Sequence, residues 1–184
     1  MALHLMRVIA GLAKGRTLTA PKGNATRPMT ERAREGLFSS LGDIVAGARV
    51  LDLYAGSGSL GIEALSRGSQ RAVFVERQAE AIDALRKNLD AVGLGGEIAT
   101  QSVEEYVSRG AAIFDLVFVD PPYAAGAAAL EELLDSLQPL VAPGGNVVLH
   151  RRKGSPPVTH PPWLTQSAFK GYGDTELFRF ERSQ

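Results

Sequence analysis

The sequence predicts an α/β fold built on a doubly wound, mostly parallel sheet of seven strands. Five short apolar runs alternate with helical patterns between residues 50 and 150. Strands joined by helical crossovers lie parallel in one sheet. The chain then closes with two β-like runs, 164–170 and 177–181, and their short connection requires an antiparallel hairpin. We therefore expect a parallel sheet that ends in an antiparallel C-terminal hairpin.

A small β-hairpin and a helix are expected ahead of this sheet, in residues 1–42. Residues 6–10 and 16–20 are β-like and flank a turn that begins and ends with glycine. Thr30 suits an N-cap, because its hydroxyl can accept a hydrogen bond from an amide of the first helical turn. A helix through Leu41 would place four apolar side chains on one face, namely Ala33, Leu37, Phe38 and Leu41.

The charge of the chain is unevenly distributed, although its formal net value is +0. Residues 1–34 carry a local charge of +6, because Glu31 alone opposes seven cations, and the remainder carries −6. The seven cations are Arg7, Lys14, Arg16, Lys22, Arg27, Arg32 and Arg34. A basic arm on a neutral-to-acidic body is typical of proteins that contact phosphates. We therefore predict a basic extension in residues 1–42 and a separate domain that carries the sheet in residues 43–184.

A glycine-rich turn follows the first strand of the sheet, residues 50–54. Residues 56–61 have the spacing G-x-G-x-x-G and lead into a helical pattern. In this context Gly56 permits a tight turn, and Gly58 allows a ligand to lie against bare backbone. Glu76 ends the second strand, 20 residues after Gly56, where an acid accepts hydrogen bonds from ribose hydroxyls. The sequence therefore predicts a ligand of the adenosine type.

The remaining elements of the sheet follow in regular alternation. The second to fifth strands are expected at residues 72–76, 97–101, 114–119 and 146–150. The helices between them are expected at residues 78–92, 103–109 and 127–141, the last one stopped by residues 143–145. Residues 151–163 are basic and rich in proline, which favours a loop. Ligands of such sheets lie beyond the carboxyl ends of the strands, where the strand order reverses.

The fourth strand ends in Asp120-Pro121-Pro122-Tyr123. Two prolines fix φ and remove two amide donors, so this segment neither extends the strand nor starts an ordinary helix. A proline terminator followed by a surface tyrosine would explain the prolines, but it leaves the acid and the aromatic ring without a role. We expect a rigid loop that presents a carboxylate, two carbonyls and an aromatic ring beside the nucleotide.

Composition excludes several other kinds of site. The chain has no cysteine, and therefore no disulfide, thiolate nucleophile or cysteine-based zinc site. His4, His150 and His160 are too scattered for a metal cluster, so we expect no metal and place each histidine at the surface or in a loop. The sequence shows neither a signal peptide nor a run of about 18 apolar residues, so we expect a cytoplasmic protein. We also expect a monomer, because no helix has a surplus apolar face.

The Asp-Pro-Pro-Tyr loop and the glycine turn together resemble the class I S-adenosylmethionine-dependent methyltransferases that act on exocyclic amino groups of bases. More narrowly, the chain resembles the RsmD-type enzymes, which methylate N2 of a guanine in 16S ribosomal RNA. The matching stretches run nearly end to end, and they are residues 7–11, 15–16, 27–35, 51–68, 118–123 and 172–175. Residues 27–35 and 172–175 are the stretches most specific to this family.

This resemblance implies a Rossmann-like methyltransferase sheet that binds S-adenosylmethionine. It implies a substrate of 16S ribosomal RNA in the small subunit or in an assembly intermediate, with no membrane partner. The residues implied for catalysis are Asp120, Pro121, Pro122 and Tyr123. Those expected to bind the cofactor are Asp52, Ala55, Gly56, Ser57, Gly58, Glu76, Arg77, Ser102 and Val103. Those expected to hold RNA are Arg7, Lys14, Arg16, Arg27, Arg32, Arg34, Lys170 and Tyr172.

Ser102, Val103 and Asp52 are expected to contact the two ends of the cofactor. Many methyltransferases place Asp or Asn after the third strand to bind the adenine amine, whereas Ser102 and Val103 stand there in this chain. The Ser102 hydroxyl and the Val103 amide are the expected substitutes. Asp52, just before the glycine turn, is expected to act through water on the amino-acid end of the cofactor.

The motifs leave other activities open. A DNA adenine-N6 methyltransferase uses a similar tetrad, but it needs a target-recognition domain for which 184 residues leave little room. A protein-amide methyltransferase shares the tetrad and needs no basic arm. A nicotinamide-dependent oxidoreductase would use the glycine turn and Glu76, and a non-catalytic RNA-binding module would use the arm alone. Neither of these last two explains residues 120–123.

Overall fold

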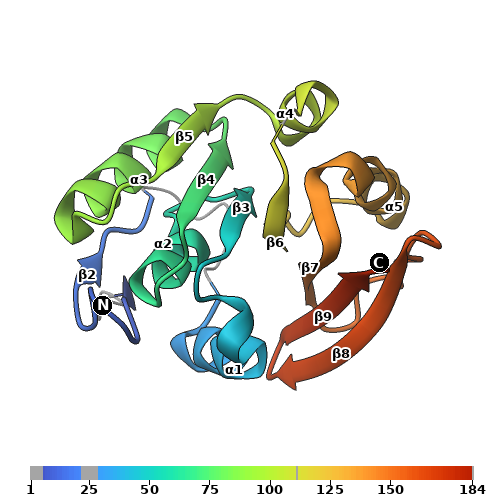
Figure 1. Cartoon of the computed structure of the whole chain (residues 1–184), viewed down its shortest axis with the longest axis horizontal. Helices are drawn as coiled ribbons and strands as arrows, with labels where there is room; N and C mark the ends of the chain where they lie inside the picture. Colours follow the sequence, from blue (N-terminus) through green and yellow to red (C-terminus); the bar gives the residue numbers. More distant parts are fainter. Residues whose placement is uncertain (1–5, 22–28, 111, 184) are drawn as a thin grey trace.

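A computed structural model describes residues 6–21, 29–110 and 112–183 of the chain. Its centre is a seven-stranded sheet with the order β5-β4-β3-β6-β7-β9-β8 (Figure 1). These strands are β3 (Arg49–Leu53), β4 (Arg71–Glu76), β5 (Glu97–Thr100), β6 (Phe114–Val119), β7 (Val141–Arg152), β8 (Leu164–Tyr172) and β9 (Thr175–Arg182). Ahead of them, β1 (Met6–Arg7) and β2 (Thr17–Leu18) form a separate two-stranded sheet.

Helices cover both faces of the central sheet (Figure 1). The helices are α1 (Glu31–Leu41), α2 (Ser59–Ser66), α3 (Ala79–Val92), α4 (Val103–Arg109) and α5 (Ala127–Ser136). Val50 of β3 packs in the core with α1, α2 and α3, whereas the next residue, Leu51, packs with α4 and α5. The central strands are apolar on both sides because helices cover both sides. Among the helices described, none is long and apolar enough to cross a membrane.

The strand pairing gives the sheet its doubly wound form. β3 pairs in parallel with β4 on one side and with β6 on the other, so the strand order reverses at β3. β4–β5 and β6–β7 are also parallel. β9 lies between β7 and β8 and is antiparallel to both. The predicted fold, a mostly parallel seven-stranded sheet with an antiparallel C-terminal hairpin, is confirmed.

The boundaries of two predicted segments are wrong. The helix expected over residues 127–141 ends at Ser136, and a 3-10 turn at Gln138–Leu140 follows it. Pro139 accounts for this end, because proline cannot donate the backbone hydrogen bond that a continuing helix requires. Residues 143–145, expected to stop the helix, lie instead within β7, beside an irregular register between Phe114 and Leu116.

The N-terminal extension is fixed onto α2. Glu63 of α2 accepts hydrogen bonds from the amides of Ile9 (2.8 Å) and Ala10 (3.0 Å), and Ser66 Oγ accepts one from Ala13 at 2.9 Å. Because these amides are engaged by side chains, the β1–β2 ladder is shorter than residues 6–10 and 16–20 predicted. Thr30 caps α1 as predicted, and its Oγ1 accepts a hydrogen bond from the Ala33 amide at 3.2 Å.

Candidate active site

A cavity of about 400 Å³ opens at the carboxyl ends of β3, β4 and β6. Tyr54, Arg77 and Asp120, which directly follow these strands, line it, and so does Met29 just before α1. The cavity therefore lies where the strand order reverses, which is the ligand-binding position of doubly wound sheets. Its volume is within the range of small-molecule and cofactor sites.

The glycine turn forms one wall of this cavity. Gly56 has φ 56°, in the left-handed region that favours glycine, and its backbone lines the cavity beside Ala55 and Ser57. Gly58 lies behind this wall, where a Cβ atom would come within 2.3 Å of Leu85 Cδ1. Gly61 lets α2 approach β4, because a Cβ atom there would be 2.3 Å from Phe74 Cε1. Gly56 and Ser57 thus present backbone to a ligand, while Gly58 and Gly61 permit close packing.

Glu76 fixes the turn from the neighbouring strand. Its Oε2 accepts a hydrogen bond from the Gly56 amide at 2.9 Å. Its Oε1 accepts from the amides of Arg77 (2.8 Å) and Gln78 (2.9 Å). The carboxylate is partly exposed at the cavity wall, and a carboxylate has about four acceptor positions. Glu76 therefore retains acceptor capacity for a ligand hydroxyl, in the place where a ribose was expected.

The structure corrects the contact expected for Asp52. Its side chain is buried beneath the glycine turn, with 1% relative exposure, and is not among the residues that line the cavity. Oδ2 accepts a hydrogen bond from the Gly61 amide at 2.8 Å. Burial raises the pKa of this carboxyl well above its usual range. Asp52 therefore holds the start of α2 in place, and a water-mediated contact with the cofactor does not fit its burial.

Ser102 and Val103 take different positions at the end of β5. Ser102 Oγ caps α4 by accepting a hydrogen bond from the Glu105 amide at 3.1 Å. The Glu105 carboxylate in turn accepts a hydrogen bond from the Ser102 amide, which completes a capping box. Val103 lines the cavity, whereas Ser102 is not among the lining residues. The capping hydrogen bond occupies the hydroxyl as an acceptor, so Val103 is the residue of this pair that faces a ligand.

Asp120 contacts a residue that the sequence analysis did not assign to the site. Its Oδ1 lies 2.5 Å from Nδ1 of His150, near the end of β7. The His150 side chain is buried, with 5% relative exposure, and lines the same cavity. We expected His150 at the surface or in a loop, and that prediction is wrong. Because β6 and β7 are parallel neighbours, the residue beyond β6 lies beside His150.

Tyr123 lines the cavity, and Arg152 lies beside its ring. Tyr123 is 47% exposed, and the guanidinium carbon of Arg152 lies 5.8 Å from the centre of its ring. A cation at this distance stabilises an aromatic ring electrostatically. Arg151, the preceding residue, is buried and donates to the Ala125 carbonyl at 3.1 Å. The sequence analysis noted the basic character of residues 151–163 but assigned no role to Arg152.

The predicted RNA-binding residues of the arm divide into two groups. Lys14, Arg16 and Arg32 are exposed, as is Arg7, whose Nε donates to Glu31 at 2.8 Å. Arg34 is 1% exposed and its guanidinium donates to the Arg7 carbonyl, so the prediction that it lies on an RNA-contacting surface is wrong. It faces inward because the hairpin packs over α1 at this point. Arg27 lies outside the described residues.

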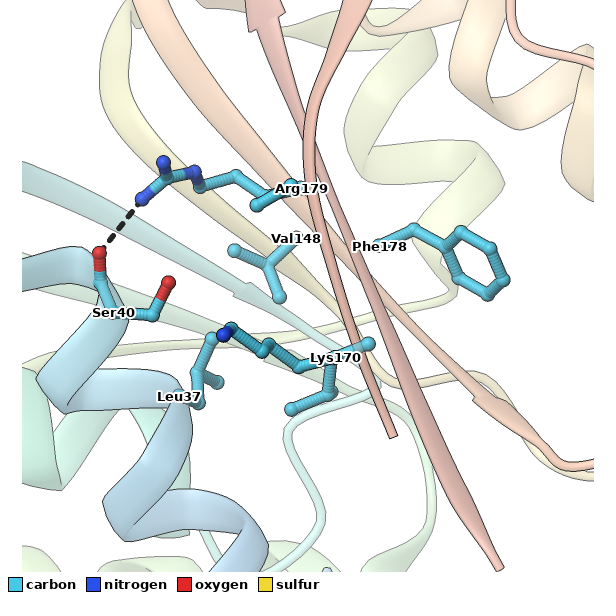
Figure 2. Close-up of a pocket in the computed structure, with 8 residues that line it drawn as sticks. Leu37, Ser40, Val148, Lys170, Phe178 and Arg179 are labelled. Atoms are coloured by element: carbon cyan, nitrogen blue, oxygen red, sulfur yellow. Dashed lines mark hydrogen bonds between the residues drawn. The ribbon is translucent and has the colours of Figure 1, made fainter. Parts of the chain in front are cut away.

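Lys170 and Tyr172 lie away from the cavity. Lys170 lines a small pocket between α1 and the C-terminal strands with Leu37 and Val148, where Arg179 donates to the Ser40 carbonyl at 2.8 Å (Figure 2). Tyr172 is partly buried in the core on the α1 side. A Cβ atom at Gly36 would come within 2.1 Å of its hydroxyl oxygen. Neither residue lines the cavity that contains Asp120.

Comparison with known proteins assigns the chain to a family. The sequence model of the family Conserved hypothetical protein 95 matches residues 6–181. The chain belongs to this family. The match includes both the glycine turn and the Asp120 loop, and it extends through the N-terminal hairpin to the last strand.

Similar members of the Conserved hypothetical protein 95 family are named as methyltransferases. YlbH of Bacillus subtilis, named as a candidate rRNA methyltransferase, is 40% identical over 160 residues, covering 84% of this chain and 87% of that protein. Ribosomal RNA small subunit methyltransferase D of Escherichia coli is 36% identical over 134 residues, covering 72% of this chain and 67% of that protein. The solved structure of yhhF, a candidate methyltransferase from Escherichia coli, has a TM-score of 0.86 at 30% identity and covers 97% of this chain and 98% of that one.

S-adenosylmethionine is the cofactor that the resemblance in sequence implies for this chain. SMU.776, solved in complex with S-adenosylhomocysteine (SAH), has the same fold at 14% identity, with a TM-score of 0.69 over 82% of this chain and 48% of that one. The residues of this chain fit the cofactor in three respects. Bare backbone faces the cavity at Gly56, an acceptor faces it at Glu76, and the cavity volume of about 400 Å³ suits a nucleoside.

Proposed function

We propose that this protein transfers a methyl group from S-adenosylmethionine to the exocyclic N2 amine of a guanine in 16S ribosomal RNA. The substrate would be the small ribosomal subunit or an assembly intermediate. The observation that carries this proposal is the position of Asp120 at the wall of the cofactor cavity. His150 binds Oδ1, and no described residue donates a hydrogen bond to Oδ2. The names of YlbH and of the Escherichia coli methyltransferase D support rRNA as the substrate class.

The glycine turn and its neighbours would hold the cofactor. Gly56 and Ser57 allow a ligand to approach the backbone closely, Glu76 accepts from the ribose hydroxyls, and Val103 packs beside the adenine. When bound, the sulfonium of S-adenosylmethionine supplies an electrophilic methyl group and keeps the electron pair of the broken carbon–sulfur bond. Because the backbone of the turn is fixed by Glu76 and by Asp52, these residues need little rearrangement to bind.

Asp120 and Pro121 would activate the amine. The lone pair of guanine N2 is delocalised into the ring, so this nitrogen is a poor nucleophile. Asp120 Oδ2 and the Pro121 carbonyl accept its two hydrogens, which favours a tetrahedral nitrogen and stabilises the positive charge as the carbon–nitrogen bond forms. The methylated nitrogen is strongly acidic and then loses one proton through Asp120 to solvent. Positioning and charge stabilisation supply the acceleration, and a strong general base is not required.

The target base must leave its stack to reach this site, because an exocyclic amine inside a helix is inaccessible to an enclosed methyl group. The exposed ring of Tyr123 at the edge of the cavity is the stacking surface for such a base. Arg152 lies over the same ring and adds a cation next to the RNA backbone. The exposed cations Arg7, Lys14, Arg16 and Arg32 extend the basic surface along the arm.

The test is methyl transfer from radiolabelled S-adenosylmethionine to three substrates: unmodified small subunits, naked 16S RNA and duplex DNA. Labelled nucleosides are then separated by chromatography. We expect label in N2-methylguanosine from subunits or 16S RNA. Label in DNA adenine alone, or in no substrate while the cofactor still binds, would contradict the proposed function.

Two variants assign the chemistry to the loop. Asp120→Ala should reduce turnover by about 100-fold or more, because it removes the charge that stabilises the transition state, with cofactor affinity within about twofold of wild type. Asp135→Ala, an exposed acid on α5, is the matched control and should retain wild-type turnover. Turnover of Asp120→Ala within about threefold of wild type would remove Asp120 from the mechanism.

A further inference from the structure

We propose that His150 is a positioning residue for the methyl-transfer step. The neutral imidazole donates its Nδ1–H to Asp120 Oδ1 and so fixes the carboxylate, with Oδ2 directed to the amine. This inference rests on the proposed role of Asp120, and it concerns a residue for which composition and spacing gave no signal.

The topology of the sheet brings the two side chains together. Val119 of β6 and Leu149 of β7 are direct partners in the parallel ladder. Asp120 and His150 each come one residue later, so their side chains leave the sheet next to each other and on the same face. Phe118 and Val148, two residues before them, also share one face, since both pack in the core with α1 to α3. The contact follows from strand register and does not depend on a loop conformation.

The hydrogen-bonding environment selects one form of the imidazole. An ionised Asp120 offers only acceptors, so at 2.5 Å the facing Nδ1 has to carry the proton. Nε2 is buried and has no hydrogen-bond partner among the described residues. A proton on Nε2, in the other neutral tautomer or in the imidazolium, would therefore leave a buried donor unpaired. The neutral Nδ1–H tautomer satisfies the contact with Asp120 and avoids this cost.

This arrangement restricts the Asp120 carboxylate. A carboxylate at the end of a strand can rotate about its last torsion, because that torsion has broad minima. The hydrogen bond from the buried His150 ring, which is itself held in the wall of the cavity with 5% exposure, removes this freedom. A catalytic group held within a few tenths of an ångström by a second residue reacts faster than one that must be ordered during the reaction. The expected effect of His150 is therefore on turnover and not on cofactor binding.

The first test uses substitutions that separate the two ring nitrogens. The Asn side-chain amide can place its NH₂ where Nδ1 stands, whereas Gln carries its amide about one bond further out. His150→Asn should retain turnover within about fivefold, and His150→Gln and His150→Leu should each lose about 30-fold or more, with KM for the cofactor within about twofold. His160→Asn is the matched control, because His160 packs against the Phe180 ring and does not line the cavity. Equal turnover in the Asn and Gln variants would overturn the inference.

The second test determines the tautomer of His150 directly in the wild-type protein, so it requires neither substrate nor a variant. The chain has three histidines, so the ¹⁵N–¹H long-range correlation spectrum of the full-length protein contains few signals to assign. We expect His150 to show a protonated Nδ1 and an unprotonated Nε2 at neutral pH. A proton on Nε2, whether in the other tautomer or in the imidazolium, would overturn the inference. If wild-type protein methylates no base, the proposed function fails, while this spectrum still decides whether His150 donates to Asp120.

Discussion

The Glu76 carboxylate at the end of β4 accepts a hydrogen bond from the Gly56 amide at 2.9 Å. This contact ties one strand end to the turn that follows the neighbouring strand. The other carboxylate oxygen accepts the amides of Arg77 and Gln78, so Glu76 determines the path of the backbone on both sides of the cavity. A single carboxylate therefore shapes the cofactor site before any ligand contacts it.

Glu76→Gln should weaken S-adenosylmethionine binding by about 10-fold or more, because an amide NH₂ would replace one of the two oxygens that accept from three backbone amides and from the ribose. Isothermal titration calorimetry with S-adenosylmethionine measures the change in Kd. Asp83→Asn, an exposed acid on α3, is the matched control and should bind as wild type does. Wild-type affinity in Glu76→Gln would show that this carboxylate neither binds the ribose nor shapes the site.

Asp52 should make the stability of the protein depend on pH in a specific direction. Burial raises the pKa of its carboxyl well above 3.8 in the folded state, so between these two values the unfolded chain ionises while the folded chain stays protonated. The free energy of unfolding contributed by Asp52 is therefore present below pH 3.8 and is lost as the pH rises, by at most about 1.4 kcal/mol per pH unit. Asp52→Asn cannot ionise and should lack this decline.

Urea unfolding of wild type and Asp52→Asn between pH 4 and pH 8 measures this effect. We expect the stability of Asp52→Asn relative to wild type to increase with pH across the lower part of that range. Asp43→Asn, in the exposed turn after α1, is the control for removing an acid without changing a buried site. Parallel stability curves for wild type and Asp52→Asn would contradict the prediction.

Gly61→Ala should destabilise the fold by about 1–3 kcal/mol, because the new Cβ would overlap the Phe74 ring beneath α2. Gly171→Ala, on the outer strand β8, adds the same methyl group to open space and should change stability by less than about 0.5 kcal/mol. Denaturant titration of both variants gives the comparison. A loss at Gly61 no larger than that at Gly171 would show that α2 can shift away from β4 without penalty.

Arg32→Ala and Arg152→Ala should each weaken RNA binding and lower the slope of log K against log salt by about 1 if each contacts one phosphate. Arg34→Met should leave that slope unchanged, since its guanidinium is buried, and should alter stability instead. Filter binding of 16S RNA at several salt concentrations distinguishes these effects. A reduced slope in Arg34→Met would show that the arm opens when it binds RNA.

Local chemistry explains what the sequence predicted correctly. Thr30 starts α1, the glycine turn joins β3 to α2, and two prolines end β6, because each of these signals depends on neighbours within a few residues. The directions of the strands follow from the helical crossovers and the short final connection. These features need no knowledge of distant contacts.

The wrong predictions concern residues whose environment is made by distant parts of the chain. Arg34 has a charge pattern typical of a surface helix, yet the hairpin 27 positions earlier covers it. His150 is an isolated histidine in the sequence, and only the pairing of β6 with β7 places it against Asp120. Strand register combined with the Asp120 motif was the one signal available, since the residue after the fourth strand must meet the end of the fifth.

Phe38 of α1 and Phe118 of β6 lie with ring centres 5.7 Å apart, and Phe118 is two residues before Asp120. Val8 and Leu18 of the hairpin belong to the same core as these two rings. Residues 1–42 therefore cannot be exchanged for another basic arm, because removing them would expose the core beneath the Asp120 loop. A change of RNA target would therefore require single substitutions of exposed cations such as Arg16 and Arg32, with residues 1–42 retained.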